Sequence, residues 1–134
     1  MSYQAIPRRS RQVILKLIES NDPNAIHEAL DSAAYWDEDW RWAQTLLLRF
    51  AQHESETVLS AVVLGFCFLA VFHGEGDEPV VAAALAEIKE RCPRLKNAVE
   101  DTQADIQHFV GMRREGKQPP FGRRLSPPVP RSHV

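Results

Sequence analysis

The stretch TVLSAVVLGFCFLAVFHG, residues 57–74, contains the longest apolar run of the sequence. Between Val58 and Phe72 only Ser60 and Gly65 are not hydrophobic, and no residue is charged. A helix that is apolar on every side either crosses a membrane or lies at the centre of a helical stack. A bilayer span needs roughly 20 apolar residues, and acidic residues flank this run where basic ones would orient a span. The stretch therefore predicts a buried central helix and no membrane insertion.

The composition is that of a globular protein with one domain. The chain has 134 residues, of which 44% are hydrophobic and 25% are charged, and this length is sufficient for one substantial core. Lys16 interrupts the N-terminal apolar run, which also lacks a small-residue cleavage site, so we expect a cytoplasmic protein. Cys67 and Cys92 lack the spacing of a metal or redox site, which predicts neither a metal nor a cofactor.

Start and stop signals predict six helices between residues 10 and 111. Capping residues or first-turn prolines precede each apolar pattern, and glycine, asparagine or proline follows most of them. Asp37 is expected to cap the third helix, Gly74 to end the fourth and Gly111 to end the sixth. The expected helices cover residues 10–21, 23–34, 37–53, 55–73, 78–92 and 93–111, and either Ser55 or Thr57 caps the fourth.

The last four predicted helices repeat with a shift of 37 positions. The shift aligns residues 61, 62, 69, 72 and 74 with residues 98, 99, 106, 109 and 111. A period near 40 with two helices per unit is typical of HEAT-type solenoids, in which each hairpin buries a face against the next. We therefore expect an all-α, HEAT-like α-solenoid of about three antiparallel hairpins, with the middle hairpin covered on both sides.

Charge is segregated along the chain. Residues 21–112 hold 16 acidic and 6 basic residues, a net charge of −10, whereas both ends of the chain are basic. An acidic domain repels phosphate backbones and attracts basic partners. The balance predicts a protein partner with a basic surface and makes nucleic acid an unfavourable ligand.

Three segments of the chain resemble small bacterial HEAT-repeat proteins, including helical-repeat immunity proteins that neutralise toxins of interbacterial competition systems. They are YWDEDWRWAQ at residues 35–44, the apolar run at residues 62–74, and residues 98–109. The likeness covers roughly residues 10–111. It implies a HEAT fold and, for the immunity proteins, a toxin domain as the partner.

Aromatic and acidic residues form the most informative candidate site. Tryptophan and tyrosine often anchor protein interfaces, and Asp101 and Asp105 share one face of the last helix without a basic partner four positions on. The alternative is that some of the tryptophans belong to the core and the acids only cap helices. The candidate partner-binding residues are Tyr35, Trp36, Asp37, Asp39, Trp40, Glu75, Asp77, Glu100, Asp101 and Asp105.

Catalytic patterns are incomplete, so we predict no enzyme and no catalytic residue. The segment 73–78 begins with His-x-Glu, as zinc deaminases do, but the Pro-Cys-x-x-Cys half is missing. Cys67 lies among apolar residues, where burial suppresses the reactive thiolate. One enzymatic alternative stays open, a HEAT-like DNA glycosylase that would use tryptophans with Asp101 or Asp105.

The two ends of the chain are predicted to lie outside the helical domain. Residues 1–9 are expected to form an N-terminal arm, and residues 112–134 a basic, proline-rich tail that is extended or disordered. Within the tail, RLSPPVP at residues 124–130 matches a motif that polyproline-binding domains recognise. The leading prediction is a protein-binding module that acts through its acidic, tryptophan-bearing surface. The most concrete version is an immunity protein that neutralises a basic toxin domain. The other alternative is a scaffold or complex subunit that binds through its tail.

Overall fold

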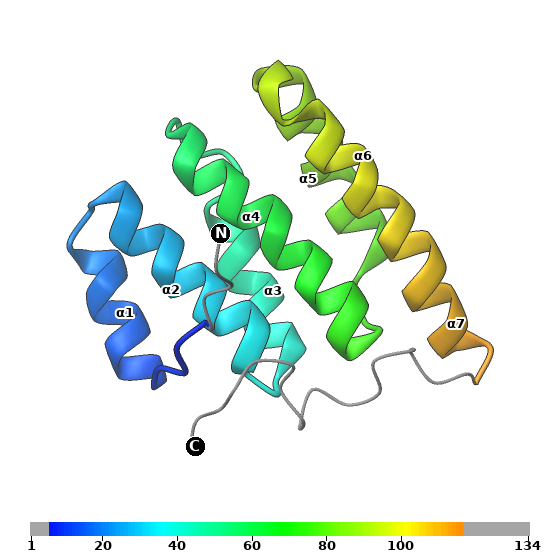
Figure 1. Ribbon diagram of the computed structural model, residues 1–134, viewed down its shortest axis with the longest axis horizontal. Helices are drawn as coiled ribbons and strands as arrows, with labels where there is room; N and C mark the ends of the chain where they lie inside the picture. Colours follow the sequence, from blue (N-terminus) through cyan, green and yellow to red (C-terminus); the bar gives the residue numbers. More distant parts are fainter. Residues whose placement is uncertain (1–5, 117–134) are drawn as a thin grey trace, which may run out of the picture.

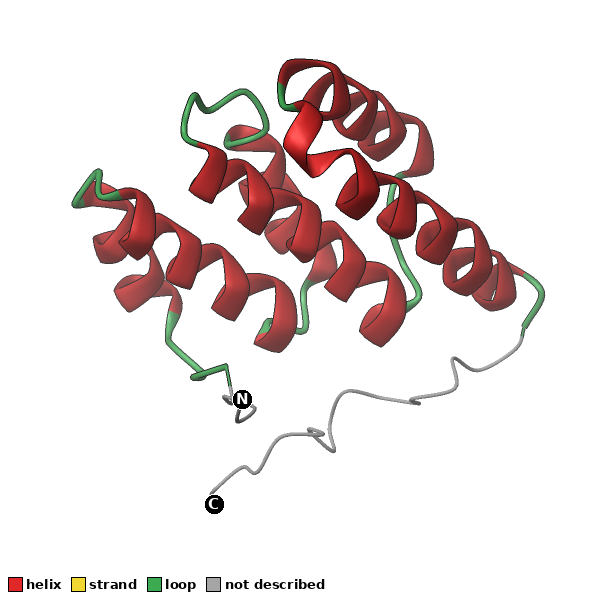
Figure 2. Cartoon of the chain, turned by 45° about the horizontal axis from the view of Figure 1, so that its top comes forward, coloured by secondary structure: helices red, strands yellow, loops and turns green. Residues whose placement is uncertain are grey.

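The computed structural model describes residues 6–116, and the regular structure in that range is entirely helical (Figures 1 and 2). This confirms the all-α prediction. Residues 1–5 of the predicted arm and residues 117–134 of the predicted tail lie outside the described residues. The elements are α1 (Arg11–Glu19), α2 (Pro23–Trp36), α3 (Trp40–Arg49), α4 (Glu56–Phe68), η1 (Leu69–His73), α5 (Glu78–Arg91), η2 (Pro93–Leu95), α6 (Lys96–Asp105), η3 (Ile106–Val110) and α7 (Gly111–Arg114).

Side-chain caps begin the first four helices. Ser10 caps α1, Asp22 caps α2 and Ser55 caps α4, each by accepting a hydrogen bond from a backbone N–H two or three residues on. Such caps satisfy donors that have no partner within the helix. Pro23 follows Asp22 in the first turn of α2, where a missing N–H is harmless. These starts are the ones that the sequence predicts.

The third helix differs from the prediction at both ends. Asp39 caps α3, whereas Asp37 closes α2 and accepts a hydrogen bond from the Asp39 N–H at 2.8 Å. The helix ends at Arg49 instead of continuing to His53. Beyond it, the Arg91 guanidinium donates to the backbone carbonyls of residues 51–53 and so satisfies acceptors that lie past the end of the helix.

Two stretches 37 positions apart have the same helical geometry. α4 covers residues 56–68, and η2 with α6 covers residues 93–105. Each continues into five residues of π-helix, Leu69–His73 and Ile106–Val110. The internal repeat seen in the sequence therefore has a counterpart in backbone geometry, down to the position of a rare helical turn.

The repeat fails at its last glycine. Gly74 ends η1 in the left-handed region with φ 65°, as predicted. Gly111 instead keeps helical angles, φ −60° and ψ −43°, and the chain continues through α7 to Arg114. The left-handed position falls on Gly116, with φ 82°. The prediction that the last helix ends at Gly111 is wrong, because a glycine ends a helix only where the backbone turns left-handed.

The helices pack so that α4 lies in the middle. Figure 1 shows α2, α4 and α6 side by side, and α4 contacts both neighbours as well as α3. One core cluster includes buried residues from α1 through α6. One described helical stretch, Glu56–His73, is long and apolar enough to cross a membrane, and half of its residues are buried within the fold.

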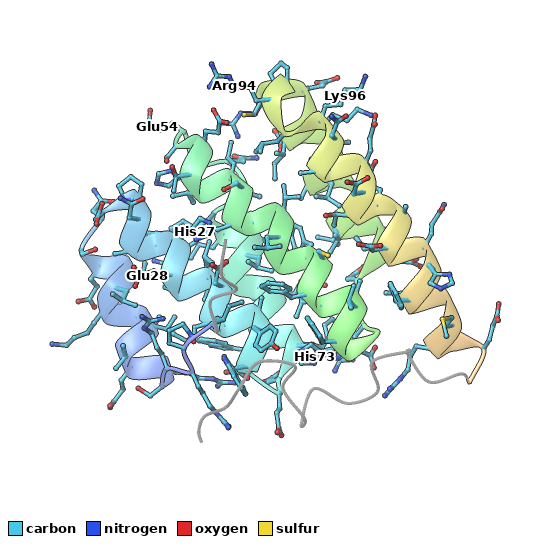
Figure 3. The ribbon with its side chains drawn as sticks, in the orientation of Figure 1. His27, Glu28, Glu54, His73, Arg94 and Lys96 are labelled. Atoms are coloured by element: carbon cyan, nitrogen blue, oxygen red, sulfur yellow. The ribbon has the colours of Figure 1, made fainter. Side chains whose placement is uncertain are left out.

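Because successive helices alternate in direction, the connections gather at two edges (Figure 3). The α2–α3 turn lies at the same edge as the α4–α5 loop, beside His73. The α3–α4 turn with Glu54 and the α5–α6 turn with Arg94 lie at the opposite edge. This alternation decides which acidic residues come together.

Candidate functional site

The α2–α3 turn and the α4–α5 loop meet at one edge of the molecule. Gln44, one turn into α3, is buried, and its side-chain oxygen accepts a hydrogen bond from the Asp77 N–H at 2.8 Å. Asp39 and Trp40 begin the same helix. The structure thus brings together two predicted groups, residues 35–40 and residues 75–77, which are far apart in the sequence.

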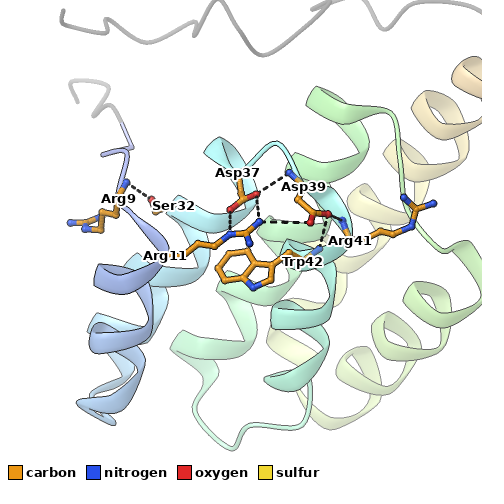
Figure 4. A network of polar contacts seen from close by, with 7 residues as sticks. All are labelled: Arg9, Arg11, Ser32, Asp37, Asp39, Arg41 and Trp42. Atoms are coloured by element: carbon orange, nitrogen blue, oxygen red, sulfur yellow. Dashed lines mark hydrogen bonds and ion pairs between the residues drawn. The ribbon is translucent and has the colours of Figure 1, made fainter.

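Arg11 forms ion pairs with two carboxylates of the α2–α3 turn, those of Asp37 and Asp39 (Figure 4). Its guanidinium donates to both oxygens of Asp37, at 2.8 and 3.0 Å, and its Nη2 lies 3.7 Å from Asp39 Oδ2. The hydrogen bond to Asp37 raises the pKa of Arg11 above its ordinary value. Two parallel bonds of this kind fix both groups in place. Asp37 therefore holds α1 to the α2–α3 turn, and its charge is already paired within the chain.

Each tryptophan is also covered by an arginine of the same chain. Arg8 lies over Trp36, Arg41 over Trp40 and Arg11 over Trp42. The distances from the guanidinium carbon to the ring centroid are 5.5, 4.5 and 4.2 Å, respectively. These are cation–π distances.

The N-terminal segment binds back onto α2. The Trp36 indole N–H donates to the carbonyl of Ile6 at 2.7 Å, and the Arg9 N–H donates to Ser32 Oγ at 3.1 Å. Arg9 also forms an ion pair with Glu28 at 3.2 Å. The basic N-terminal residues and the acidic, aromatic turn thus form one internal contact. The signal in the sequence was the group Arg8, Arg9 and Arg11, of which the prediction assigned Arg8 and Arg9 to a separate arm and Arg11 to the first helix.

Tyr35 does not belong to any surface. Its side chain is 1% exposed, and its ring meets Trp36, Phe68 and Phe72 edge-on at centroid distances of 5.0 to 5.4 Å. The prediction that Tyr35 contacts a partner is wrong, because α2 continues through residue 36 and directs this side chain at α4 and η1. Tyr35 instead packs α2 onto the central helix.

Exposed carboxylates remain at the meeting of the two turns. Glu38 and Asp77 are exposed, and the Asp39 side chain is 56% exposed. Trp40 is half-buried beside them, and Glu75 forms an ion pair with Arg113 of α7 at 3.4 Å. We call these five residues, Glu38, Asp39, Trp40, Glu75 and Asp77, the acidic edge.

The three predicted acids of the last helix have separate environments. Glu100 forms an ion pair with Lys89 of α5 at 3.1 Å, although no basic residue stands four positions on in its own helix. The partner comes from the neighbouring helix, which a search along one helix does not reveal. Asp101 is exposed. None of the three belongs to the acidic edge.

Asp105 faces the central helix and accepts a hydrogen bond from the Cys67 thiol, with 3.3 Å between Sγ and Oδ2. Burial raises the pKa of Cys67 to about 12, and the bond to Asp105 contributes to the rise. A thiol with so high a pKa is almost entirely protonated at neutral pH, which agrees with the inert role that the sequence predicts.

The segment 73–78 lies beside a small hollow of the described structure. The hollow is lined by Gln44, Phe66, Leu69, Glu75, Gly76, Glu78, Val81 and Ile106. Among residues 6–116, no three histidine, cysteine or acidic side chains are grouped as a metal site requires. Comparison with protein-family models, curated proteins and solved structures finds no match to this chain.

Proposed function

We propose that this chain is a HEAT-like helical-repeat module that binds a partner protein with a basic surface through the acidic edge. The most specific form of the proposal is an immunity protein that covers the basic site of a toxin domain. The 37-residue repeat of helix and π-turn supports the repeat architecture. Stacked hairpins of this kind present their turns along an edge.

The observation that carries the proposal is that Glu38 and Asp39 of the α2–α3 turn and Asp77 of the α4–α5 loop are exposed at the same edge of the molecule (Figure 3). They come from turns separated by a whole hairpin, and the Gln44 hydrogen bond at 2.8 Å fixes one turn against the other. Carboxylates grouped in this way attract a basic surface at long range and speed association. Trp40, half-buried at the same place, supplies an aromatic contact of the kind that anchors interfaces.

The arginine contacts within the chain indicate which partner side chains the acidic edge would bind. Within the chain, the Arg11 guanidinium binds the Asp37 carboxylate and lies over the Trp42 ring. The Arg41 guanidinium lies over the Trp40 ring. A partner that presents arginine to Glu38, Asp39 and Asp77 would meet the same chemistry. Such contacts weaken as salt screens them, so affinity should fall with ionic strength.

The test is calorimetric titration of the chain with the polypeptide encoded directly upstream of it. The variant Glu38→Lys/Asp77→Lys reverses two charges of the acidic edge, and we expect its affinity to fall roughly a hundredfold. The matched control, Glu54→Lys/Glu90→Lys, makes the same charge change on exposed acids outside the acidic edge and is expected to change affinity by less than about threefold.

Two outcomes would contradict the proposal. Equal losses in both variants would show that only net charge matters, and no loss in either would exclude this edge. Tight binding of duplex DNA at low salt would favour the glycosylase alternative, since an acidic edge repels phosphates.

A further inference from the structure

One side of the central helix is only partly covered. Leu64 is 38% exposed, and Cys67, Phe68 and Val71 are each half-buried. Spaced at i, i+3, i+4 and i+7, these residues lie on one face of α4 and η1. We call them the open stripe. The sequence predicts that this helix is covered on several sides, and the described elements leave this one face only partly covered.

Acidic side chains border the open stripe on both sides. Asp31 lies one turn before Tyr35 on the face of α2 that packs against Phe68. On the other side, Asp105 bonds Cys67 at 3.3 Å, and Asp101 lies one turn before it on α6. A ligand for this face therefore needs apolar groups at its centre and positive charge at its margins.

Residues 117–134 of the same chain have this composition. The segment contains Lys117, Arg123, Arg124 and Arg131, no acidic residue, and three apolar residues at intervals of four, Phe121, Leu125 and Val129. It follows Gly116 directly. The preceding helix, α7, is tied to the α4–α5 loop by the Arg113–Glu75 ion pair at 3.4 Å. The described chain therefore ends near the C-terminal end of the open stripe.

The length of the segment is sufficient. Eighteen extended residues reach roughly 60 Å, whereas neighbouring helix axes lie about 10 Å apart and the 18 residues of α4 and η1 are about 27 Å long. A second copy of the chain would bring acidic margins against acidic margins. A tethered segment also has a high effective concentration, about millimolar for a short flexible connection.

We propose that residues 117–134 bind across the open stripe, with apolar side chains on Leu64 and Phe68 and basic side chains on Asp101 and Asp105. The proposal does not depend on the function assigned to the acidic edge, because it concerns a different face of the molecule. It gives the basic end of the chain a role in covering its own central helix.

The test is paramagnetic relaxation in the full chain. A spin label is attached at Ser126→Cys in a Cys67→Ser/Cys92→Ser background, where serine at 67 retains a donor for Asp105. We expect the resonances of Leu64 and Val71 to lose most of their intensity and those of Val80, an exposed residue of α5, to keep theirs. The change Arg123→Glu/Arg124→Glu should restore the lost intensity, because it replaces attraction to the acidic margins with repulsion.

Three results would overturn the proposal. The first is equal intensity at Leu64 and Val80 in the labelled chain. The second is the same loss at Leu64 when labelled and unlabelled chains are mixed, which would assign the open stripe to a second copy. The third is binding of phosphatidylcholine vesicles by the open stripe with the tail intact, which would assign it to a lipid surface.

Discussion

The central stretch α4–η1 and the C-terminal stretch α6–η3 share a backbone and differ in chemistry. Both end in a five-residue π-turn, 37 positions apart. The first is almost entirely apolar, whereas the second carries Glu100, Asp101 and Asp105. The reason is position: α4 has a helix on each side, α2 and α6, while α6 packs on α4 and α5 at one end of the described stack. Place in the stack, more than the helix itself, decides the composition.

The comparison extends to single residues. Gly65 of α4 corresponds to Thr102 of α6, and Leu47 of α3 corresponds to Ala84 of α5. A β-carbon at Gly65 would lie 2.5 Å from Leu47 Cδ2, and Leu47 is fully buried. Large and small residues are thus exchanged between the two hairpins. The predictions below use such matched positions, in order of expected effect.

The largest effect is expected at Gly65. Gly65→Thr gives α4 the residue of its counterpart, but Leu47 has no room to move, so the free energy of unfolding should fall by about 2–3 kcal/mol. Leu47→Ala alone should cost about 2–5 kcal/mol by leaving a cavity. The double variant should cost at least about 1 kcal/mol less than the sum, because the threonine fills that cavity. Urea unfolding measures all three, and strict additivity would contradict the packing argument.

Opposite signs are expected at the next pair of matched positions. Gly74→Ala forces a side chain into the left-handed region, at φ 65°, and should cost about 1 kcal/mol. Gly111→Ala adds a better helix former where nothing lies within 4 Å of the new carbon, and should stabilise by up to about 1 kcal/mol. Thermal unfolding of the two variants would refute the distinction if both shifts had the same sign.

The smallest effect concerns His27, on the flank of α2. Its hydrogen bond to Asp31, with 3.1 Å between the two atoms, raises the pKa of His27 above its ordinary value. The resulting stability is fully present below the unfolded pKa of about 6.5 and is lost as pH rises through the higher folded pKa. Because the site is partly exposed, the contribution should be a few tenths of a kcal/mol.

The measurement for His27 is urea unfolding from about pH 5.5 to about pH 8.5, a range that includes the unfolded histidine pKa of about 6.5 and extends further above it because the folded pKa is raised. As pH rises, the free energy of unfolding of the wild-type chain should fall relative to that of the His27→Gln variant, because only the wild-type chain loses the charged His27–Asp31 pair. Parallel pH profiles for the two proteins would show that the His27–Asp31 pair contributes nothing measurable.

Local signals made much of the fold predictable. Ser10, Asp22-Pro23 and Ser55 start helices where their chemistry requires, and Gly74 ends one. The shift of 37 residues aligned residue 69 with residue 106, which are the positions where the two π-helices begin. The cap at Asp39 was missed because Asp37 has the same capping chemistry, and only the contact with Arg11, 26 positions earlier, separates their roles.

The candidate site was less predictable, because it depends on contacts between distant segments. The sequence showed that acids and tryptophans are concentrated in residues 36–42. It did not show that Arg8, Arg11 and Arg41 lie over the three tryptophan rings. The Glu100–Lys89 and Asp105–Cys67 contacts likewise join separate elements. A single helix pattern shows which residues share a face and leaves open what that face meets.

The most direct test of the proposed function is a hydrogen-exchange footprint of the chain in complex with the polypeptide encoded upstream. A partner bound at the acidic edge should slow amide exchange in residues 37–44 and 74–78 and leave the opposite edge, residues 53–57 and 91–97, unchanged. Protection of the opposite edge, with residues 37–44 and 74–78 exchanging as in the free chain, would contradict the assignment of this surface.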